Sequence, residues 1–204
     1  MYCLQFLKYY YRSFYFFIFI FFQSVNSSNE ITEIIGVLLI VKKILIISAT
    51  NDKNLDLAKE LCGIVSNMNI ETELVSLQDL NLPLFDSDIL VEENVVENLI
   101  DRISKSSGLI ICAPEYNGGV PPVLSNAITW ISVKSEHWRD AFNGKFALIA
   151  THSGGSGNRF LTAFRSQLEY MGTNVLSRTI SVSKNNPFNK SSVNNIIESF
   201  VKII

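Results

Sequence analysis

The sequence predicts an α/β domain with a mainly parallel sheet and helices on both faces. Two observations predict it. From residue 42 onward, short apolar runs rich in β-branched residues alternate with segments of helical periodicity, and the connections between them are short. Strands that alternate with helices demand a parallel sheet, and right-handed crossovers then leave a doubly wound arrangement.

The strands are predicted from their apolar runs. "KILIISA" is continuously apolar, which is typical of a strand buried on both faces. The five expected strands are Lys43–Ala49, Glu71–Leu77, Gly108–Ala113, Lys145–Ser153 and Asn174–Ser183. Five strands in one domain favour the flavodoxin-like order 2-1-3-4-5 over a six-stranded dinucleotide-binding fold.

The helices are predicted from apolar spacing and from residues that start or end a helix. Pro121 and Pro122 suit a helix start, where the missing N–H costs nothing, and Gly172 suits a helix end. The expected helices are Asn54–Val65, Val91–Ser104, Val120–Ser132, Asn158–Gly172 and Ser191–Ile204. "QDLNLPLFDSD" (Gln78–Asp88) is expected to be a turn-rich loop.

Composition narrows the function classes. The chain has 204 residues and a formal net charge of -2, so no basic bias points to nucleic acid. Its three cysteines, Cys3, Cys62 and Cys112, form no CxxC pair. A disulfide framework or a zinc site is therefore not indicated, and reduced thiols in a cytoplasmic protein are the simpler interpretation.

Residues 1–41 form an aromatic and apolar N-terminal extension that differs from the domain predicted at 42–204. Its uninterrupted apolar stretch, Phe14–Phe22, is too short to cross a bilayer core of roughly 30 Å. Membrane attachment is therefore not expected unless residues 1–22 are retained in the mature protein. Three interpretations stay open: a signal or anchor, a loosely ordered extension, or an over-extended gene prediction, which we favour.

Ligands of such a fold bind beyond the carboxyl ends of the strands, which directs attention to three loops. The first, "SATNDKN", brings hydroxyls and amides to the start of a helix, as a phosphate site requires. Its candidate residues are Ser48, Thr50, Asn51 and Asn54. The alternative is an ordinary helix cap with Asn51 or Asp52 as the capping residue.

The second loop, "PEYNGG", combines a ring face, an amide and two glycines that allow close backbone approach. A flat heteroaromatic ligand would use this set. A simple turn would explain Pro114, Asn117 and the glycines, but not Glu115 or Tyr116. The third loop, "THSGGSGNR", is rich in glycine but is neither a P-loop nor a nucleophile elbow.

The segment "APEYNGGVPPVLSNAITWIS" is similar to the signature of the NADPH-dependent FMN reductase family, which includes quinone, azo-dye and chromate reductases of flavodoxin-like fold. The resemblance extends to "NLPLFDSD" and "GKFALIATHSGGSGNRF" and covers roughly Lys42–Ile180. It implies an oxidoreductase with FMN as cofactor and NADPH or NADH as hydride donor. It also implies a quinone or similar small molecule as acceptor, and a homodimer or homotetramer.

The resemblance also implies residue roles. The Ser48–Asn54 loop would hold the FMN phosphate, although Asn51 stands where the family often has an arginine. The isoalloxazine would contact two sets of residues: Pro114, Glu115, Tyr116, Asn117 and Gly118 on one side, and Ser153, Gly154 and Gly155 on the other. Flavin N5 would accept the hydride, so no catalytic side chain and no metal are expected. His152 is assigned to the rim or the structure rather than to proton donation.

Two other functions fit the same fold. The chain could be a flavodoxin-like electron carrier without nicotinamide turnover, or an interaction subunit that has lost its flavin. A net charge of only -2 and a first loop without a run of threonines argue against the carrier.

Overall fold

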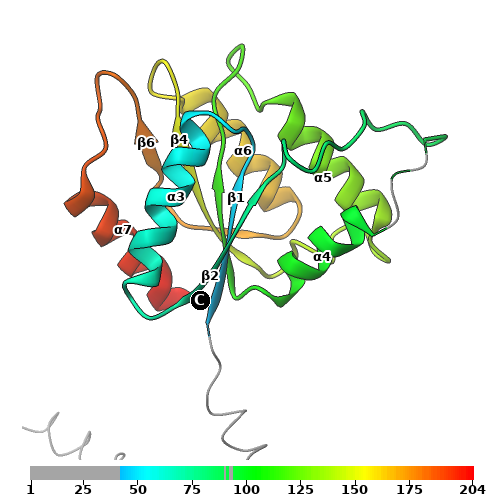
Figure 1. Ribbon diagram of the computed structural model, residues 1–204, viewed down its shortest axis with the longest axis horizontal. Helices are drawn as coiled ribbons and strands as arrows, with labels where there is room; N and C mark the ends of the chain where they lie inside the picture. Colours follow the sequence, from blue (N-terminus) through cyan, green and yellow to red (C-terminus); the bar gives the residue numbers. More distant parts are fainter. Residues whose placement is uncertain (1–41, 90, 92–93) are drawn as a thin grey trace, which may run out of the picture. The chain divides into compact units, whose positions relative to one another are not determined.

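A parallel sheet forms the centre of the fold (Figure 1), as seen in a computed structural model that describes residues 42–89, 91 and 94–204. The extension predicted at residues 1–41 lies outside these residues. The strands are β1 (Lys43–Ser48), β2 (Glu71–Ser76), β3 (Gly108–Cys112), β4 (Phe146–His152), β5 (Asn174–Val175) and β6 (Ile180–Val182). Their order is β2-β1-β3-β4-β5, with β6 also paired to β4, which confirms the predicted flavodoxin-like order.

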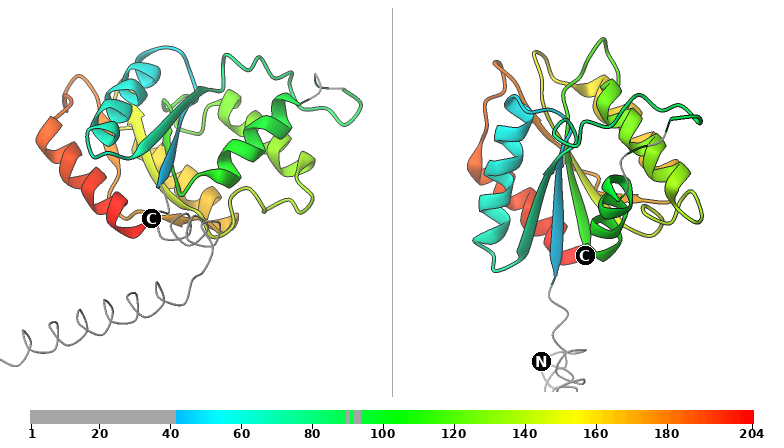
Figure 2. Two further views of the ribbon diagram at one scale, coloured as in Figure 1. Left: turned by 60° about the horizontal axis from the view of Figure 1, so that its bottom comes forward. Right: turned by 45° about the vertical axis from the view of Figure 1, so that its right-hand side comes forward.

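Helices cover both faces of the sheet (Figure 2). They are α3 (Lys53–Ser66), α4 (Val95–Lys105), α5 (Pro122–Lys134), α6 (Asn158–Tyr170) and α7 (Lys190–Ile203). Ile44 and Ile46 of β1 pack toward α3 and α7, whereas Leu45 and Ile47 pack toward α4, α5 and α6. Successive strand residues point to opposite faces, so a run such as "KILIIS" must be apolar throughout to fill both layers.

The fifth strand differs from its prediction. The segment expected to be one strand at Asn174–Ser183 is divided into two strands, β5 and β6. Each of them pairs with β4 in parallel orientation. Arg165 of α6 binds the chain at this interruption. Its guanidinium donates hydrogen bonds to the carbonyls of Val175 (3.2 Å), Leu176 (2.6 Å) and Ser177 (3.3 Å). Carbonyls turned toward Arg165 cannot continue the sheet ladder, so the strand breaks there.

The start of α4 is the other clear difference. The helix was expected from Val91 but begins at Val95, after Asn94 adopts a left-handed conformation with φ of 81°. The remaining helix and strand ends lie close to their predicted positions.

The predicted loop at Gln78–Asp88 is fixed on α5. Asn126 accepts a hydrogen bond from the Phe85 N–H (2.8 Å) and donates one to the Pro83 carbonyl (2.8 Å). Trp130 donates to the same carbonyl (2.8 Å), and its ring meets Phe85 edge-on at 4.9 Å between centroids. Hydrogen bonds and an aromatic contact thus hold this loop beside the carboxyl edge of the sheet.

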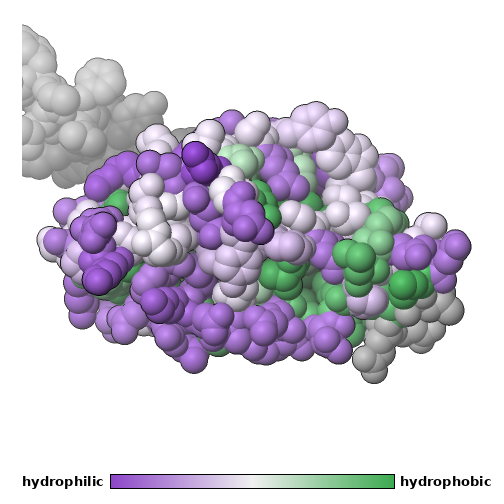
Figure 3. Space-filling view, turned by 90° about the horizontal axis from the view of Figure 1, so that it is seen from above, coloured by the Kyte–Doolittle hydropathy of each residue, from purple (hydrophilic) through white to green (hydrophobic). Residues whose placement is uncertain are grey.

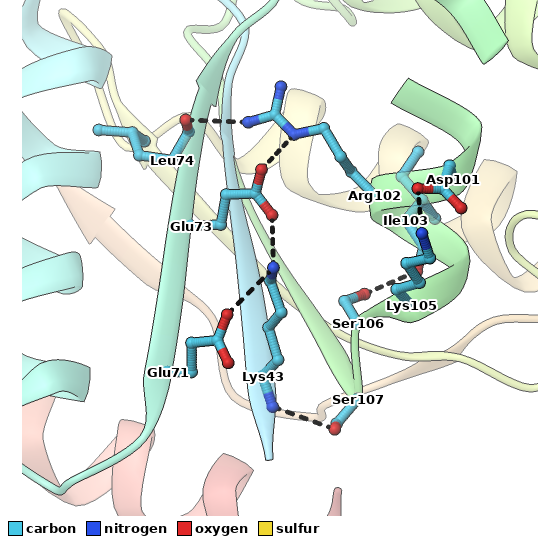
Figure 4. A network of polar contacts seen from close by, with 10 residues as sticks. All are labelled: Lys43, Glu71, Glu73, Leu74, Asp101, Arg102, Ile103, Lys105, Ser106 and Ser107. Carbon is cyan, nitrogen blue, oxygen red and sulfur yellow. Dashed lines mark hydrogen bonds and ion pairs between the residues drawn. The ribbon is translucent and has the colours of Figure 1, made fainter. Parts of the chain in front are cut away.

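A polar network ties α4 to the edge strand β2 (Figure 4). Lys43 of β1 forms ion pairs with Glu71 (3.1 Å) and Glu73 (3.0 Å), and Glu73 also pairs with Arg102 of α4. Partial burial raises the pKa of Glu73, but the Lys43 hydrogen bond and the Arg102 charge together hold it below its ordinary value.

Candidate functional site

A cleft of about 480 Å³ opens where β1, β3 and β4 end. Its volume lies within the range of small-molecule sites. The predicted site residues that line it are Thr50, Asn54, Pro114, Glu115, Tyr116, Ser153 and Gly154. Four further lining residues were not among the predicted site residues: Asp52, Lys53, Asp56 and His152. Viewed from above, the surface on this side of the molecule is largely hydrophilic (Figure 3).

The first loop leaves one polar group without a partner. Ser48 is fully buried, and its hydroxyl donates to the Thr50 carbonyl (2.7 Å). Thr50 is 6% exposed, and its Oγ1 has no hydrogen-bond partner within the described part of the chain. Asp52 occupies the N-cap position of α3 but makes no side-chain hydrogen bond to the helix. A buried hydroxyl and an uncapped helix start therefore meet at one end of the cleft.

Asn51 lies outside the cleft lining. Its Oδ1 accepts from Ser76, its Nδ2 donates to Asp79, and its N–H donates to Gln78 Oε1 (3.0 Å). These partners belong to the end of β2 and the loop after it. The amide is turned toward the neighbouring strand, so it is not placed to replace the arginine that the family often carries here.

Asn54 fastens the first loop to the end of β4. Its Nδ2 donates to the His152 carbonyl (2.9 Å), and its Oδ1 accepts from the His152 N–H (2.8 Å). Asn54 is 2% exposed, so both of its polar atoms are buried and used. The residue fixes the position of His152 and the width of the cleft, while its side-chain amide is committed to the protein.

Glu115 caps α6. Its Oε2 accepts hydrogen bonds from the backbone N–H groups of Arg159 (3.0 Å) and Phe160 (3.1 Å), which begin that helix. Its own N–H donates to Ser153 Oγ (2.8 Å). A carboxylate at a helix N-terminus is favourable because it satisfies free N–H groups and complements the helix dipole. The β3 and β4 loops are thereby joined.

Asn117 and Gly118 form the tip of a tight turn. Their φ values are 50° and 72°, and Tyr116 and Gly119 bond across them (2.9 Å and 3.4 Å). Positive φ at both central positions defines a type I′ turn, for which Asn-Gly is the preferred pair. Tyr116 remains 46% exposed beside the cleft, so the turn presents its ring.

The glycines of the third loop serve different purposes. Gly157 has φ of +66°, and a Cβ there would lie 2.7 Å from Thr151 Cγ2, so folding itself requires glycine. A Cβ at Gly154 or Gly155 would meet nothing within 4 Å. Packing does not require glycine at those two positions, and both residues are exposed.

His152 ends β4 and is the histidine among the residues that line the cleft. Burial and the nearby Lys53 charge lower the pKa of its imidazole, while Asp56 acts in the opposite direction.

Among the residues that the structure describes, no cluster of His, Cys, Asp or Glu is arranged to hold a metal ion. Within the same residues, no helix is both long enough and apolar enough to span a membrane.

Comparison with known proteins decides the family. The model of the NADPH-dependent FMN reductase family matches residues 42–187. The chain belongs to this family. Among its relatives, a quinone reductase of Escherichia coli is 35% identical over 48% of this chain and 53% of its own length. An NAD(P)H-dependent FMN reductase of Pseudomonas aeruginosa is 33% identical over 66% of this chain and 65% of its own length.

Solved structures of flavoenzymes share the fold of this family member. FerB, an NAD(P)H:acceptor oxidoreductase of Paracoccus denitrificans, superposes with a TM-score of 0.64 at 20% identity, over 79% of this chain and 96% of its own. A short-chain flavodoxin reaches 0.57 at 15% identity, over 80% and 99%. The sequence matches to the curated relatives named above cover about half to two thirds of those proteins.

Proposed function

We propose that the chain is an FMN-dependent NAD(P)H oxidoreductase that passes hydride from the nicotinamide, through the flavin, to a quinone or a similar small acceptor. One observation carries the proposal beyond family membership. The cleft lies where the β1, β3 and β4 loops meet, and at one end the buried Thr50 hydroxyl lacks a partner beside the start of α3. A buried polar atom without a partner is costly unless a ligand completes it.

The residues of the cleft fit FMN. Thr50 Oγ1 and the first N–H groups of α3 suit the phosphate, because a helix N-terminus attracts anions. Pro114 and the exposed Tyr116 ring would lie along one side of the isoalloxazine. Gly154 and Gly155, which are exposed and carry no side chain, would approach it from the other side.

The other predicted contacts act by holding the loops. Ser48, Asn54, Glu115 and Ser153 direct side-chain atoms to the protein itself. Asn117 and Gly118 shape the turn that presents Tyr116. These residues therefore orient the cofactor through the backbone they fix rather than through their own polar atoms.

Bound FMN would supply hydride acceptance and electron delivery, which no amino-acid side chain can supply. The task of the chain is to bind the ring, to expose one face to donor and acceptor in turn, and to direct backbone N–H groups at the ring edge where charge grows on reduction. We further propose a homodimer or homotetramer in the cytoplasm, to be checked by light scattering and by fractionation.

A visible absorption spectrum, recorded before and after anaerobic addition of NADPH or NADH, tests the proposal. We expect flavin bands after loading with FMN, and their loss with at least one nicotinamide. Bound flavin that neither nicotinamide reduces would instead indicate an electron carrier. Protein that never binds FMN would indicate an interaction subunit.

A variant pair tests the phosphate end of the cleft. Thr50→Val keeps the shape of the side chain but removes the hydroxyl, so FMN affinity should fall. Thr162→Val, on the exposed face of α6, is the matched control and should bind FMN like the unaltered protein. Equal affinities in the two variants would show that Thr50 does not contact the phosphate.

A further inference from the structure

The phosphate end of the cleft is short of positive charge. Asp52 and Asp56 contribute two carboxylates and Lys53 one ammonium group, all on the first two turns around the start of α3. A phosphate monoester brings about -1.5 to -2 further charges at pH 7. Asn51 adds no cation, and its amide faces β2. A phosphate bound here would need another positive group.

His152 is the remaining group in the cleft that can become positive there. It ends β4, and both of its backbone polar atoms are held by Asn54 from the first turn of α3. The same cleft contains Thr50 and Lys53. The backbone of His152 is thus held at the start of α3, and the residue lines the same cleft as Thr50, whose hydroxyl lacks a partner in the described part of the chain.

We propose that His152 is a phosphate-binding residue of this cleft, and that it takes up one proton from solvent when the flavin phosphate binds beside Thr50 and Lys53. The inference rests on the proposed function, because it assumes FMN as ligand. According to this inference, His152 at the end of β4 supplies the positive charge that the Ser48–Asn54 loop lacks.

The charges around His152 explain why the proton arrives with the ligand. Without an anion, burial and Lys53 lower the pKa of the imidazole, so the neutral form dominates at pH 7. A dianion in contact with the ring favours the charged form. The other titratable groups that line the cleft with His152 are Asp52 and Asp56 of α3 and Glu115 and Tyr116 of the β3 loop. On the β6 side, Val182 pairs with His152, and the exposed Lys184 follows two residues later.

Binding of FMN and riboflavin between pH 7.0 and 8.5 distinguishes this role from that of a simple rim histidine. Above pH 7 the flavin phosphate stays largely dianionic, because its second pKa is about 6. A one-unit rise in the imidazole pKa on binding changes FMN affinity about tenfold only well below both pKa values. Between pH 8.5 and 7.0 we therefore expect FMN affinity, measured by quenching of flavin fluorescence, to rise about twofold for such a pKa rise, and by more for a larger one. Riboflavin lacks the phosphate and should show no such rise.

Two histidine variants provide the matched comparison, since the chain has only two histidines. His152→Gln should bind FMN several-fold more weakly at pH 7.0, with the pH dependence lost and riboflavin affinity unchanged. His137→Gln, in an exposed loop, should behave like the unaltered protein. In the His137→Gln protein the remaining imidazole gives a single Hε1 signal in the proton NMR spectrum, and the imidazole pKa read from its titration should rise with FMN but not with riboflavin.

The possible failures are separable. If the unaltered protein and His152→Gln bind FMN equally well, and the imidazole pKa stays unchanged on binding, the role of His152 is refuted while the proposed function stands. If no flavin binds at any pH, the proposed function fails and this inference fails with it. The NMR titration retains His152, so it decides the matter even if His152→Gln does not fold.

Discussion

Replacing Glu115 should destabilise the protein whether or not flavin is bound. Its carboxylate holds the N–H groups of Arg159 (3.0 Å) and Phe160 (3.1 Å) at the start of α6. Glu115→Ala removes the acceptor of both N–H groups. Because Phe160 is fully buried, water cannot easily replace the carboxylate at its N–H. Loss of a helix cap costs about 1–2 kcal/mol, and loss of the charge at the helix dipole adds about 0.3–1 kcal/mol. We therefore expect a loss of about 2 kcal/mol.

Urea denaturation and thermal melting of the flavin-free full chain measure this effect. For a domain of this size, a loss of about 2 kcal/mol lowers Tm by about 4–8 °C. Glu115→Gln retains an oxygen acceptor without the charge and should lose about 1 kcal/mol or less. Glu136→Ala, at an exposed position, is the control. Equal stability of Glu115→Ala and Glu136→Ala would refute the capping role and return Glu115 to the candidate flavin contacts.

Three further predictions concern other parts of the fold. Gly157→Ala should cost about 2–4 kcal/mol because of its positive φ and the resulting clash, whereas Gly154→Ala should stay within about 0.5 kcal/mol, as measured by urea denaturation. Asn54→Ala should cost about 2–3 kcal/mol, because the N–H and carbonyl of His152 lose their partners; an unchanged Tm would contradict this. Glu73→Gln should flatten the acid dependence of stability. The lowered pKa of Glu73 means that its ion pairs stabilise the fold above about pH 4.5 and are lost as the pH falls through the folded pKa. Since the Glu73 side chain is 29% exposed, Glu73→Gln should cost less than about 1 kcal/mol of stability at pH 7. At pH 3.5 the cost should be smaller; an equal loss of stability at pH 3.5 and pH 7, measured from urea midpoints, would contradict this.

The fold was largely predictable because it depends on local patterns. Apolar runs and helical periodicity located the first four strands closely, and strand alternation with helices led to the correct sheet order. The break between β5 and β6 was not predictable in this way. It depends on Arg165, which lies on another element and competes with the sheet for carbonyl groups.

The location of the candidate site was predictable, but the use of individual side chains was not. Ligands of parallel α/β sheets bind beyond the carboxyl ends of the strands, which points to the loops after β1, β3 and β4. The cleft lies at these loops. Glu115 looked free of any turn requirement, yet it caps a helix that begins more than forty residues later in the chain. Asn51 turns to partners after β2. Such choices depend on which loops the sheet brings together, and local sequence does not contain that information.

The interruption at Arg165 also has a consequence for how the protein behaves at high concentration. An outermost strand with a long row of free carbonyls and N–H groups is a template on which another chain can add a strand, and this is a common start of aggregation. Here that edge consists of two short pieces, and the carbonyls between them are occupied by a guanidinium. The same arginine that shortens the strand thereby leaves an incoming chain little continuous backbone to pair with.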